Sequence, residues 1–146
     1  MRVSWLVPAA LLVVACGSDT PPDPAVALRD TPPVTITLRA GEQTAVNNVE
    51  LIFGGVSEDS RCPIDVVCPS AGNAKVELGV GPLVGTRGPT YLVELNTTEG
   101  PRSGEAWDLR VVLLALRPEP VSTQTIKPED YVVELRVGGV NKLLNP

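Results

Sequence analysis

Proline and glycine interrupt this chain every few residues, and this punctuation limits what the chain can form. The 146-residue sequence contains fifteen prolines and thirteen glycines. Proline removes a backbone donor and clashes with the preceding helical turn, whereas glycine inside a helix costs backbone entropy. Long helices are therefore not expected. The length allows one domain with short extensions.

Between the interruptions, apolar and polar residues alternate with the period of a strand that buries one face. Strand regions are predicted at 34–38, 44–53, 74–80, 90–95, 107–116 and 131–137. We expect Asn47 and Asn48 to bend or bulge the second region, Gly54–Gly55 to end it, and the polar segment 96–105 to form a loop. From residue 34 to 146 the pattern predicts an all-β domain of six or seven strands. Its architecture would be an antiparallel β-sandwich (Ig-like) or a small barrel.

The most apolar region is the run 107–116. Strict alternation would place one set of side chains on one face (Leu109, Val111, Leu113, Ala115) and another on the opposite face (Val112, Leu114, Leu116). A strand that is apolar on both faces favours a central position covered on both sides, or an edge that packs on a neighbour. A short helix is the alternative interpretation.

Composition and charge argue against several classes of function. The net charge is −5, which disfavours nucleic-acid binding because that binding depends on neutralising phosphates. Histidine is absent, so the commonest general base and metal ligand are missing. No glycine-rich phosphate loop opens a helix. With aromatic residues at only 3%, an aliphatic core is expected rather than an aromatic-lined groove. We therefore predict no enzyme activity, no catalytic residue and no cofactor.

The N-terminal residues have the pattern of an export signal. A short basic start precedes a mainly apolar run of thirteen residues, 3–15, which is too short for a membrane span of about 20 residues. The run ends in Val13-Val-Ala-Cys16, which resembles the lipobox of bacterial lipoproteins. The resemblance implies that residues 1–15 are a signal peptide and that Cys16 carries a lipid anchor. Two or three acyl chains anchor a protein stably where one is marginal.

A proline-rich segment follows the proposed anchor. Five prolines lie between residues 17 and 33, and they prevent a helix or a central strand there. We predict that 16–33 forms the lipidated cysteine and a tether, part extended and part flexible, and that 34–146 forms the β-domain.

The other two cysteines, Cys62 and Cys68, form an even pair in a chain predicted to be exported, and such a pair indicates a disulfide. The alternatives are a redox pair or a thiolate metal site. Redox pairs usually have two intervening residues, and a zinc site would need further Cys or His ligands. The loop-entropy model assigns a bridge of this span roughly 2 kcal/mol, so we expect it to fix the shape of the loop.

The loop closed by this disulfide is the candidate recognition element. Its candidate residues are Asp59, Arg61, Ile64, Asp65, Val66 and Val67. The apolar three would form an exposed tip in a recognition loop, but we favour the interpretation that they fold back onto the sheet. Glu58, Asp59 and Asp65 are hard oxygen ligands, yet their spacing matches no calcium motif. We expect no metal here, and instead a local turn in which Asp59 caps backbone N–H groups and pairs with Arg61.

The segment 59–74 reads Asp-Ser-Arg-Cys-Pro-Ile-Asp-Val-Val-Cys-Pro-Ser-Ala-Gly-Asn-Ala. It resembles a segment of small, uncharacterised bacterial envelope lipoproteins, which carry Asp-Ser-Arg-Cys-Pro, a second Cys and then a Trp-x-Gly-x-Ala ending. Gly72 and Ala74 match this ending, while Ser70 stands where the Trp often stands. The resemblance implies a place in the envelope and brings no activity with it.

These observations predict a non-catalytic lipoprotein of the bacterial cell envelope, held on the inner or outer membrane by its lipid, with a binding or structural role. The alternative is an exported inhibitor or ligand-binding module that acts through the Cys62–Cys68 loop.

Overall fold

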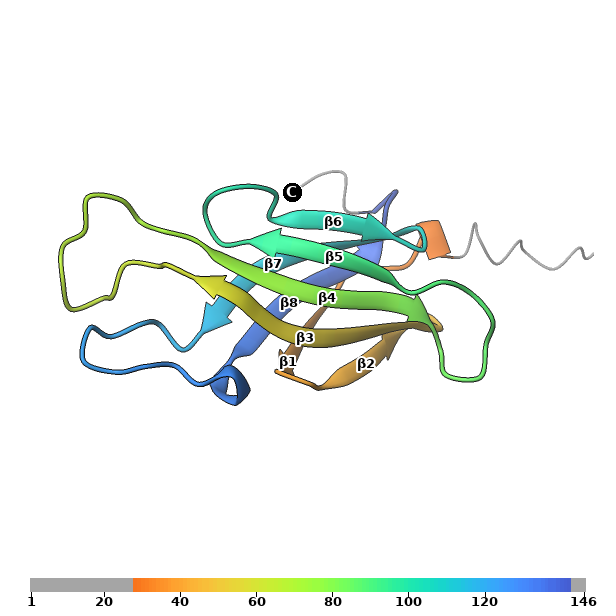
Figure 1. Ribbon diagram of the computed structural model, residues 1–146. Coiled ribbons are helices and arrows are strands. Elements are labelled where there is room, and N and C mark those ends of the chain that lie inside the picture. Colours follow the sequence, from red (N-terminus) through yellow and green to blue (C-terminus); the bar gives the residue numbers. More distant parts are fainter. Residues whose placement is uncertain (1–27, 143–146) are drawn as a thin grey trace, which may run out of the picture.

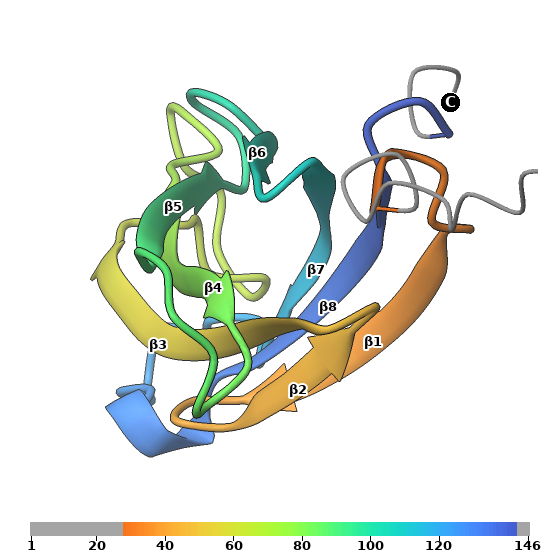
Figure 2. The same cartoon turned by 90° about the vertical axis from the view of Figure 1, so that its right-hand side faces the viewer.

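The computed structural model describes residues 28–142, which form an all-β domain of two antiparallel four-stranded sheets (Figures 1 and 2). The elements in chain order are β1 (Val34–Arg39), β2 (Gln43–Val46), β3 (Val49–Asp59), β4 (Ala74–Pro82), β5 (Tyr91–Asn96), β6 (Ser103–Ala106), β7 (Leu109–Arg117), the single-turn 3-10 helix η1 (Pro128–Asp130) and β8 (Val132–Gly139). The predicted β-sandwich is confirmed, and the sheets do not close into a barrel. The described part has eight strands rather than six or seven.

The two sheets have the strand orders β1-β8-β7-β6 and β2-β3-β4-β5. A tight corner at residues 40–42 carries the chain from the first sheet to the second. The N–H of Gly41 donates to the carbonyl of Phe53 at 2.7 Å, and the N–H of Phe53 donates to the carbonyl of Glu42 at 2.9 Å. The facing side chains of both sheets form one aliphatic core around Phe53, the only phenylalanine in the sequence.

The predicted strand over 44–53 is two strands. Asn47 and Asn48 both have positive φ angles, 47° and 66°, and form the two-residue turn between β2 and β3. Asparagine is favoured at such positions because its side chain tolerates the left-handed region. Gly54–Gly55 does not end the strand. Instead β3 passes through two register shifts against β4 and continues to Asp59, which extends it into the cysteine loop.

The prediction of a loop over 96–105 is wrong at its C-terminal end. Residues Ser103–Ala106 form β6, which pairs with β7 through a two-residue turn at Trp107 and Asp108. Both turn residues again have positive φ angles. The segment is too short and too polar to show strand alternation, and its position at the edge of a sheet explains why polar residues are tolerated there.

The region predicted at 107–116 is a strand, and it is buried on one face only. A register shift between Leu113 and Ala115 against β8 inserts one extra residue. Leu114 is exposed, as alternation places it, but the bulge moves Leu116 into the core, so strict alternation assigned Leu116 to the wrong face. β7 lies between β8 and β6 and is therefore not an edge strand.

The folded part begins before the predicted boundary at residue 34. Thr31 is buried, and its carbonyl accepts a hydrogen bond from the N–H of Gly139 at 2.8 Å. Leu28 packs against the core. Residues 28–33 thus belong to the domain rather than to a tether. The predicted signal peptide, Cys16 with its predicted lipid anchor, and the rest of the predicted tether lie outside the described residues.

Candidate functional site

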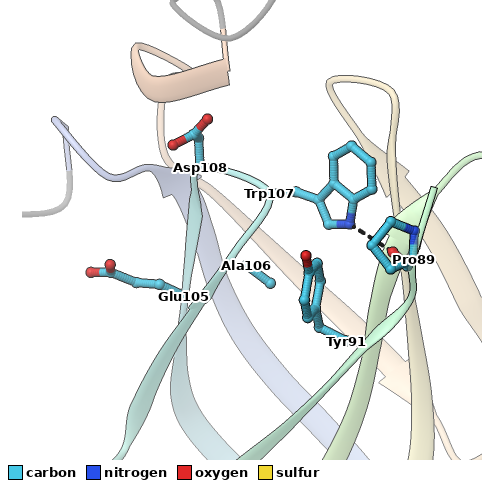
Figure 3. A pocket seen from close by; sticks show the side chains of 6 residues that line it. All are labelled: Pro89, Tyr91, Glu105, Ala106, Trp107 and Asp108. Carbon is cyan, nitrogen blue, oxygen red and sulfur yellow. Dashed lines mark hydrogen bonds between the residues drawn. The ribbon is translucent and has the colours of Figure 1, made fainter.

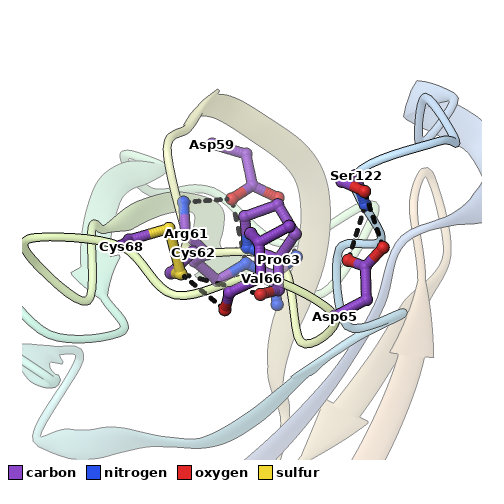
Figure 4. The surroundings of a disulfide bond; sticks show 8 residues. All are labelled: Asp59, Arg61, Cys62, Pro63, Asp65, Val66, Cys68 and Ser122. Atoms are coloured by element: carbon purple, nitrogen blue, oxygen red, sulfur yellow. Dashed lines mark hydrogen bonds and ion pairs between the residues drawn. A yellow bond between two sulfur atoms is a disulfide. The ribbon is translucent and has the colours of Figure 1, made fainter.

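The loop between β3 and β4, residues 60–73, extends beyond the ends of the strands beside the segment 118–131 that precedes β8 (Figure 1). The predicted disulfide between Cys62 and Cys68 is present, with the two Cα atoms 5.9 Å apart (Figure 4). This separation lies in the ordinary range for a disulfide. The bond closes a ring of backbone that carries the candidate recognition residues.

An ion pair at the end of β3 begins the loop. Asp59 accepts hydrogen bonds from Arg61 at its backbone N–H (3.1 Å), its Nε (2.9 Å) and its Nη2 (2.7 Å). Both side chains are mostly buried. The structure therefore shows the local turn expected from the sequence, in which one carboxylate caps a backbone group and pairs with a guanidinium.

The same guanidinium ties the loop to the end of β7. Arg61 Nη1 donates to the carbonyl of Leu116 and Nη2 to the carbonyl of Pro118, both at 3.0 Å. The carboxylate of Glu119 lies 3.8 Å from Nη1. Arg61 thus supplies donors to one side chain of its own loop and to two carbonyls of the neighbouring segment, which makes it the central residue of this end of the domain.

Tyr131 completes the cluster from the start of β8. Its hydroxyl donates to Asp59 Oδ2 at 3.0 Å. Burial alone would raise the pKa of Asp59, but the hydrogen bonds and charge of Arg61 outweigh it, and the pKa falls below its ordinary value. Burial and the bond to Asp59 together raise the pKa of Tyr131 to about 12. The pair is therefore carboxylate and neutral phenol across the physiological pH range.

A second set of bonds fixes the tip of the loop. Asp65 accepts from the N–H of Ser122 at 2.8 Å and from its hydroxyl at 2.6 Å (Figure 4). These two bonds lower the pKa of Asp65. The N–H of Ile64 donates to the carbonyl of Pro120 at 3.0 Å. Within the ring, the N–H of Val66 donates to the carbonyl of Pro63 at 3.3 Å and closes a turn.

The base of the loop depends on Gly72 and Asn73. Gly72 has a φ of 67°, and a Cβ there would lie 1.8 Å from the carbonyl oxygen of Ser60, so no larger residue fits without a backbone shift. Asn73 donates from its side chain to Asn96 at 2.7 Å, and its carbonyl accepts from the N–H of Ser60 at 2.7 Å. The loop is therefore tied at its base, its side and its tip.

The three apolar residues of the ring face outward. Ile64 is 69% exposed, Val66 is 45% exposed and Val67 is fully exposed. The expectation that they fold back onto the sheet is wrong. The polar contacts of Asp65 and of the Ile64 N–H occupy the side of the loop that faces residues 118–122, so the apolar side chains point to solvent.

The carboxylates do not converge on a common point. Glu58 pairs with Lys75 at 2.9 Å, Asp59 binds Arg61, and Asp65 binds Ser122. Within residues 28–142 the structure contains no group of three or more His, Cys, Asp or Glu side chains placed to hold a metal ion.

The structure brings all six predicted residues close to the segment 118–131 or exposes them on the tip. It also adds partners that the sequence did not indicate. These partners are Ser122 and Tyr131, together with the carbonyls of Leu116, Pro118 and Pro120. They lie more than fifty positions away along the chain, and no local pattern links them to the loop.

Comparisons with known proteins add no identity to this geometry. The chain matches no protein-family model, and searches of curated proteins and of solved structures found no significant match. Over the described range, no helix has the length and apolar character needed to cross a bilayer.

Proposed function

We propose that this chain is a non-catalytic, lipid-anchored module of the bacterial cell envelope that binds a protein partner through the Cys62–Cys68 loop. One observation carries the binding role: Ile64, Val66 and Val67 are exposed on a loop whose backbone is fixed on several sides. A loop with only a structural role would be expected to bury such side chains, since each contributes about 1.5 kcal/mol or more to the stability of the fold when it is removed from water.

The fixed backbone supports recognition because it lowers the entropy lost on binding. A flexible loop must order its side chains and backbone when a partner binds, and a preorganised loop has already done so on folding. The exposed residues are small and aliphatic, and they cover a short turn rather than a broad face. This geometry suits insertion of the tip into an apolar pocket of a partner protein.

The position of the loop agrees with an N-terminal anchor. The loop and residue 28 lie at opposite ends of the domain (Figure 1). A lipid on Cys16, followed by the proline-rich tether, would hold the domain at the end near residue 28. The loop would then face away from the inner or outer membrane on which the protein sits.

Inhibition of a protease is the less well supported form of this proposal. A substrate-like inhibitory loop offers an extended backbone to the protease, because it pairs with the enzyme like a strand. Here the hydrogen bond from Val66 to Pro63 closes a turn in the middle of the ring. A partner that accepts a turn in a pocket fits this shape better than a protease cleft does.

The binding role is tested with the purified full chain immobilised in detergent and exposed to envelope extract of the source bacterium. The double variant Ile64→Asp/Val67→Asp keeps the disulfide and the Asp65 contacts, so we expect the fold to remain and specific capture to be lost. Val84→Asp is the matched control, because Val84 is 84% exposed and belongs to the loop between β4 and β5, which lies at the other end of the domain (Figure 1). Equal capture by the double variant and the wild type would refute the proposal.

The anchor is tested separately by growing the bacterium with labelled palmitate. We expect label on the wild-type chain and none on Cys16→Ser. Label that persists in Cys16→Ser would refute lipidation at this cysteine, without bearing on the loop.

A further inference from the structure

The β6–β7 turn lies at the end of the domain opposite the cysteine loop (Figure 1), and a hollow beside it is a candidate for a second binding site (Figure 3). It measures about 360 Å³ and is lined by Pro89, Tyr91, Glu105, Ala106, Trp107 and Asp108. Tyr91 begins the edge strand β5, and Pro89 lies two residues before that strand. The other four residues belong to the β6–β7 hairpin. The hollow is therefore lined by Trp107, the only tryptophan among the described residues, and by the exposed Tyr91.

The turn that carries Trp107 is conformationally unusual. Trp107 has a φ of 53° and Asp108 a φ of 56°, in a two-residue turn where Asn-Gly or Asp-Gly is normally found. A bulky residue at positive φ is an outlier, and strained residues of this kind concentrate at functional sites. The indole packs against the core but is only partly buried, so part of its surface stays open to solvent.

The indole is nevertheless held in one position. Its Nε1–H donates to the carbonyl of Pro89 at 3.1 Å (Figure 3). Gly88 allows this approach, since a Cβ at that position would lie 2.6 Å from Cη2 of the indole. Trp107 also lines an adjacent hollow of about 280 Å³ with Asn48 and Pro82, so the ring stands between two depressions. It is oriented by its neighbours without being enclosed by them.

Tyr91 provides a second aromatic ring with a free polar group. Its side chain points from β5 toward the indole, and the residue is 50% exposed (Figure 3). Within residues 28–142 its hydroxyl has no hydrogen-bond partner. An aromatic ring with a polar end at the rim of a hollow can contact an apolar ligand face and bond to a ligand hydroxyl at once.

The charges around the hollow are balanced. Glu105 is paired with Arg110, and Asp108 accepts from Arg29 Nε at 3.0 Å. A cationic ligand would have to compete with these guanidinium groups for both carboxylates, so cation–π recognition is disfavoured. A neutral ligand with many hydroxyl groups avoids that competition, because carboxylates accept and guanidinium groups donate hydrogen bonds without a change in net charge.

We infer that the Trp107–Tyr91 hollow is a saccharide-binding site, in which the aromatic rings contact the C–H face of a sugar and the ion-paired groups bond its hydroxyls. This site is independent of the cysteine loop and does not rest on the function proposed for it. An envelope protein with both sites would hold a glycan at the end near residue 28 and a protein at the other end.

The test uses the full chain in detergent, with ¹⁵N label in the tryptophan indoles and the valine amides, and titrations with chitotriose and maltotriose. The backbone N–H of Val67, on the cysteine loop, serves as an internal reference for the Trp107 indole. We expect at least one trisaccharide to shift the Trp107 indole resonance saturably while that of the Val67 amide stays in place. Tyr91→Ala should weaken this response at least tenfold, and Tyr91→Phe should weaken it less. Leu92→Ala, on the same strand but outside the hollow, should leave it unchanged.

Three results would overturn the inference. The first is no saturable shift of Trp107 with either trisaccharide. The second is a shift of the Val67 amide equal to that of the Trp107 indole. The third is a stronger response to tetramethylammonium chloride than to either sugar, which would make the hollow a cation site. Spectra of the Tyr91 variants without ligand report whether the fold is kept, and Tyr91→Phe remains informative if Tyr91→Ala does not fold.

Discussion

The two ends of this domain achieve fixed geometry in opposite ways. At the cysteine end, an irregular loop is held by a disulfide, a mostly buried ion pair and bonds to carbonyls, and its apolar side chains face solvent. At the other end, a regular two-residue turn positions an aromatic ring at the cost of an unfavourable φ. The comparison shows that polar contacts can fix the backbone of an irregular loop as firmly as strand pairing fixes a hairpin. The cysteine end leaves aliphatic side chains exposed to a ligand, whereas the other end leaves aromatic side chains exposed.

Among substitutions at the two ends of the domain, the largest expected effect comes from Arg61→Ala. The change leaves the Asp59 carboxylate mostly buried without its cation and removes donors from two carbonyls, so we expect the free energy of unfolding to fall by about 3 kcal/mol. Urea unfolding of the full chain measures it. Lys75→Ala breaks only an exposed pair with Glu58 and serves as the control, with no measurable change expected. Equal losses in the two variants would show that Arg61 is not the centre of the loop network.

Gly72→Ala is expected to have the next largest effect. The new Cβ would meet the Ser60 carbonyl at 1.8 Å and would also sit at positive φ, so we expect a loss of about 2 kcal/mol or more. Gly41→Ala is the matched control. Gly41 also has a positive φ but has no atom within 4 Å of the new Cβ, so only the conformational cost of about 1 kcal/mol applies. A loss at Gly72 no greater than at Gly41 would contradict the close packing at the base of the loop.

The Asp59–Tyr131 bond makes stability depend on pH at both extremes. Because folding lowers the pKa of Asp59, its contribution is present above its ordinary value of 3.8 and is lost as the pH falls through the lower, folded-state pKa. Because folding raises the pKa of Tyr131 from 10.0 to about 12, its contribution is present below pH 10 and is lost as the pH rises toward 12.

Thermal melts across pH 2–5 and 9–12 measure both effects, within the windows set by these shifts. Asp59→Asn should flatten the acid limb and Tyr131→Phe the alkaline limb, each relative to the wild type. Variants whose melts follow the wild type in both windows would show that this pair contributes no linkage.

Trp107→Asn is expected to have the smallest effect. Asparagine is preferred at positive φ, so the conformational gain should offset the lost indole contacts and keep the change within about 1 kcal/mol. Phe53→Ala, at the centre of the core, should cost about 3–5 kcal/mol and gives the scale for a packed aromatic ring. If Trp107→Asn lowers the free energy of unfolding as much as Phe53→Ala does, the indole acts as a core residue and the contrast between the two ends of the domain disappears.

Much of the fold could be predicted because the local patterns are clear. Alternation along β4 and β5 places Val76, Leu78 and Val93 on the buried face, as the structure shows. Prediction failed where a single residue changes the register. The bulge in β7 reverses the faces after Leu113, and the Asn47–Asn48 turn divides one apparent strand into two. Alternation assigns side chains to a face by counting residues along the chain, so it cannot reveal where a bulge inserts an extra residue.

The site could be predicted only in part. The even pair of cysteines in a chain predicted to be exported was enough to indicate the disulfide, and the Asp59–Arg61 turn is local. The outward direction of Ile64 and Val67 depends on contacts with Pro120 and Ser122, which are distant in sequence. The low aromatic content argued against an aromatic-lined groove. Composition cannot show that two of the few aromatic side chains, Tyr91 and Trp107, line the same hollow.

The pairing of β1 with β8 has a consequence for how the chain reaches this structure. Val34 lies opposite Val137, and β8 also separates β1 from β7. The first sheet therefore cannot assemble until nearly the whole chain is available, whereas the β2–β3–β4 hairpins can form earlier. Such long-range pairing slows folding, because the two ends of the chain must lose conformational entropy before their pairing contributes any stabilising contact. In a chain of this topology the first sheet stays incomplete until the last strand arrives, even where the second sheet has already begun to form.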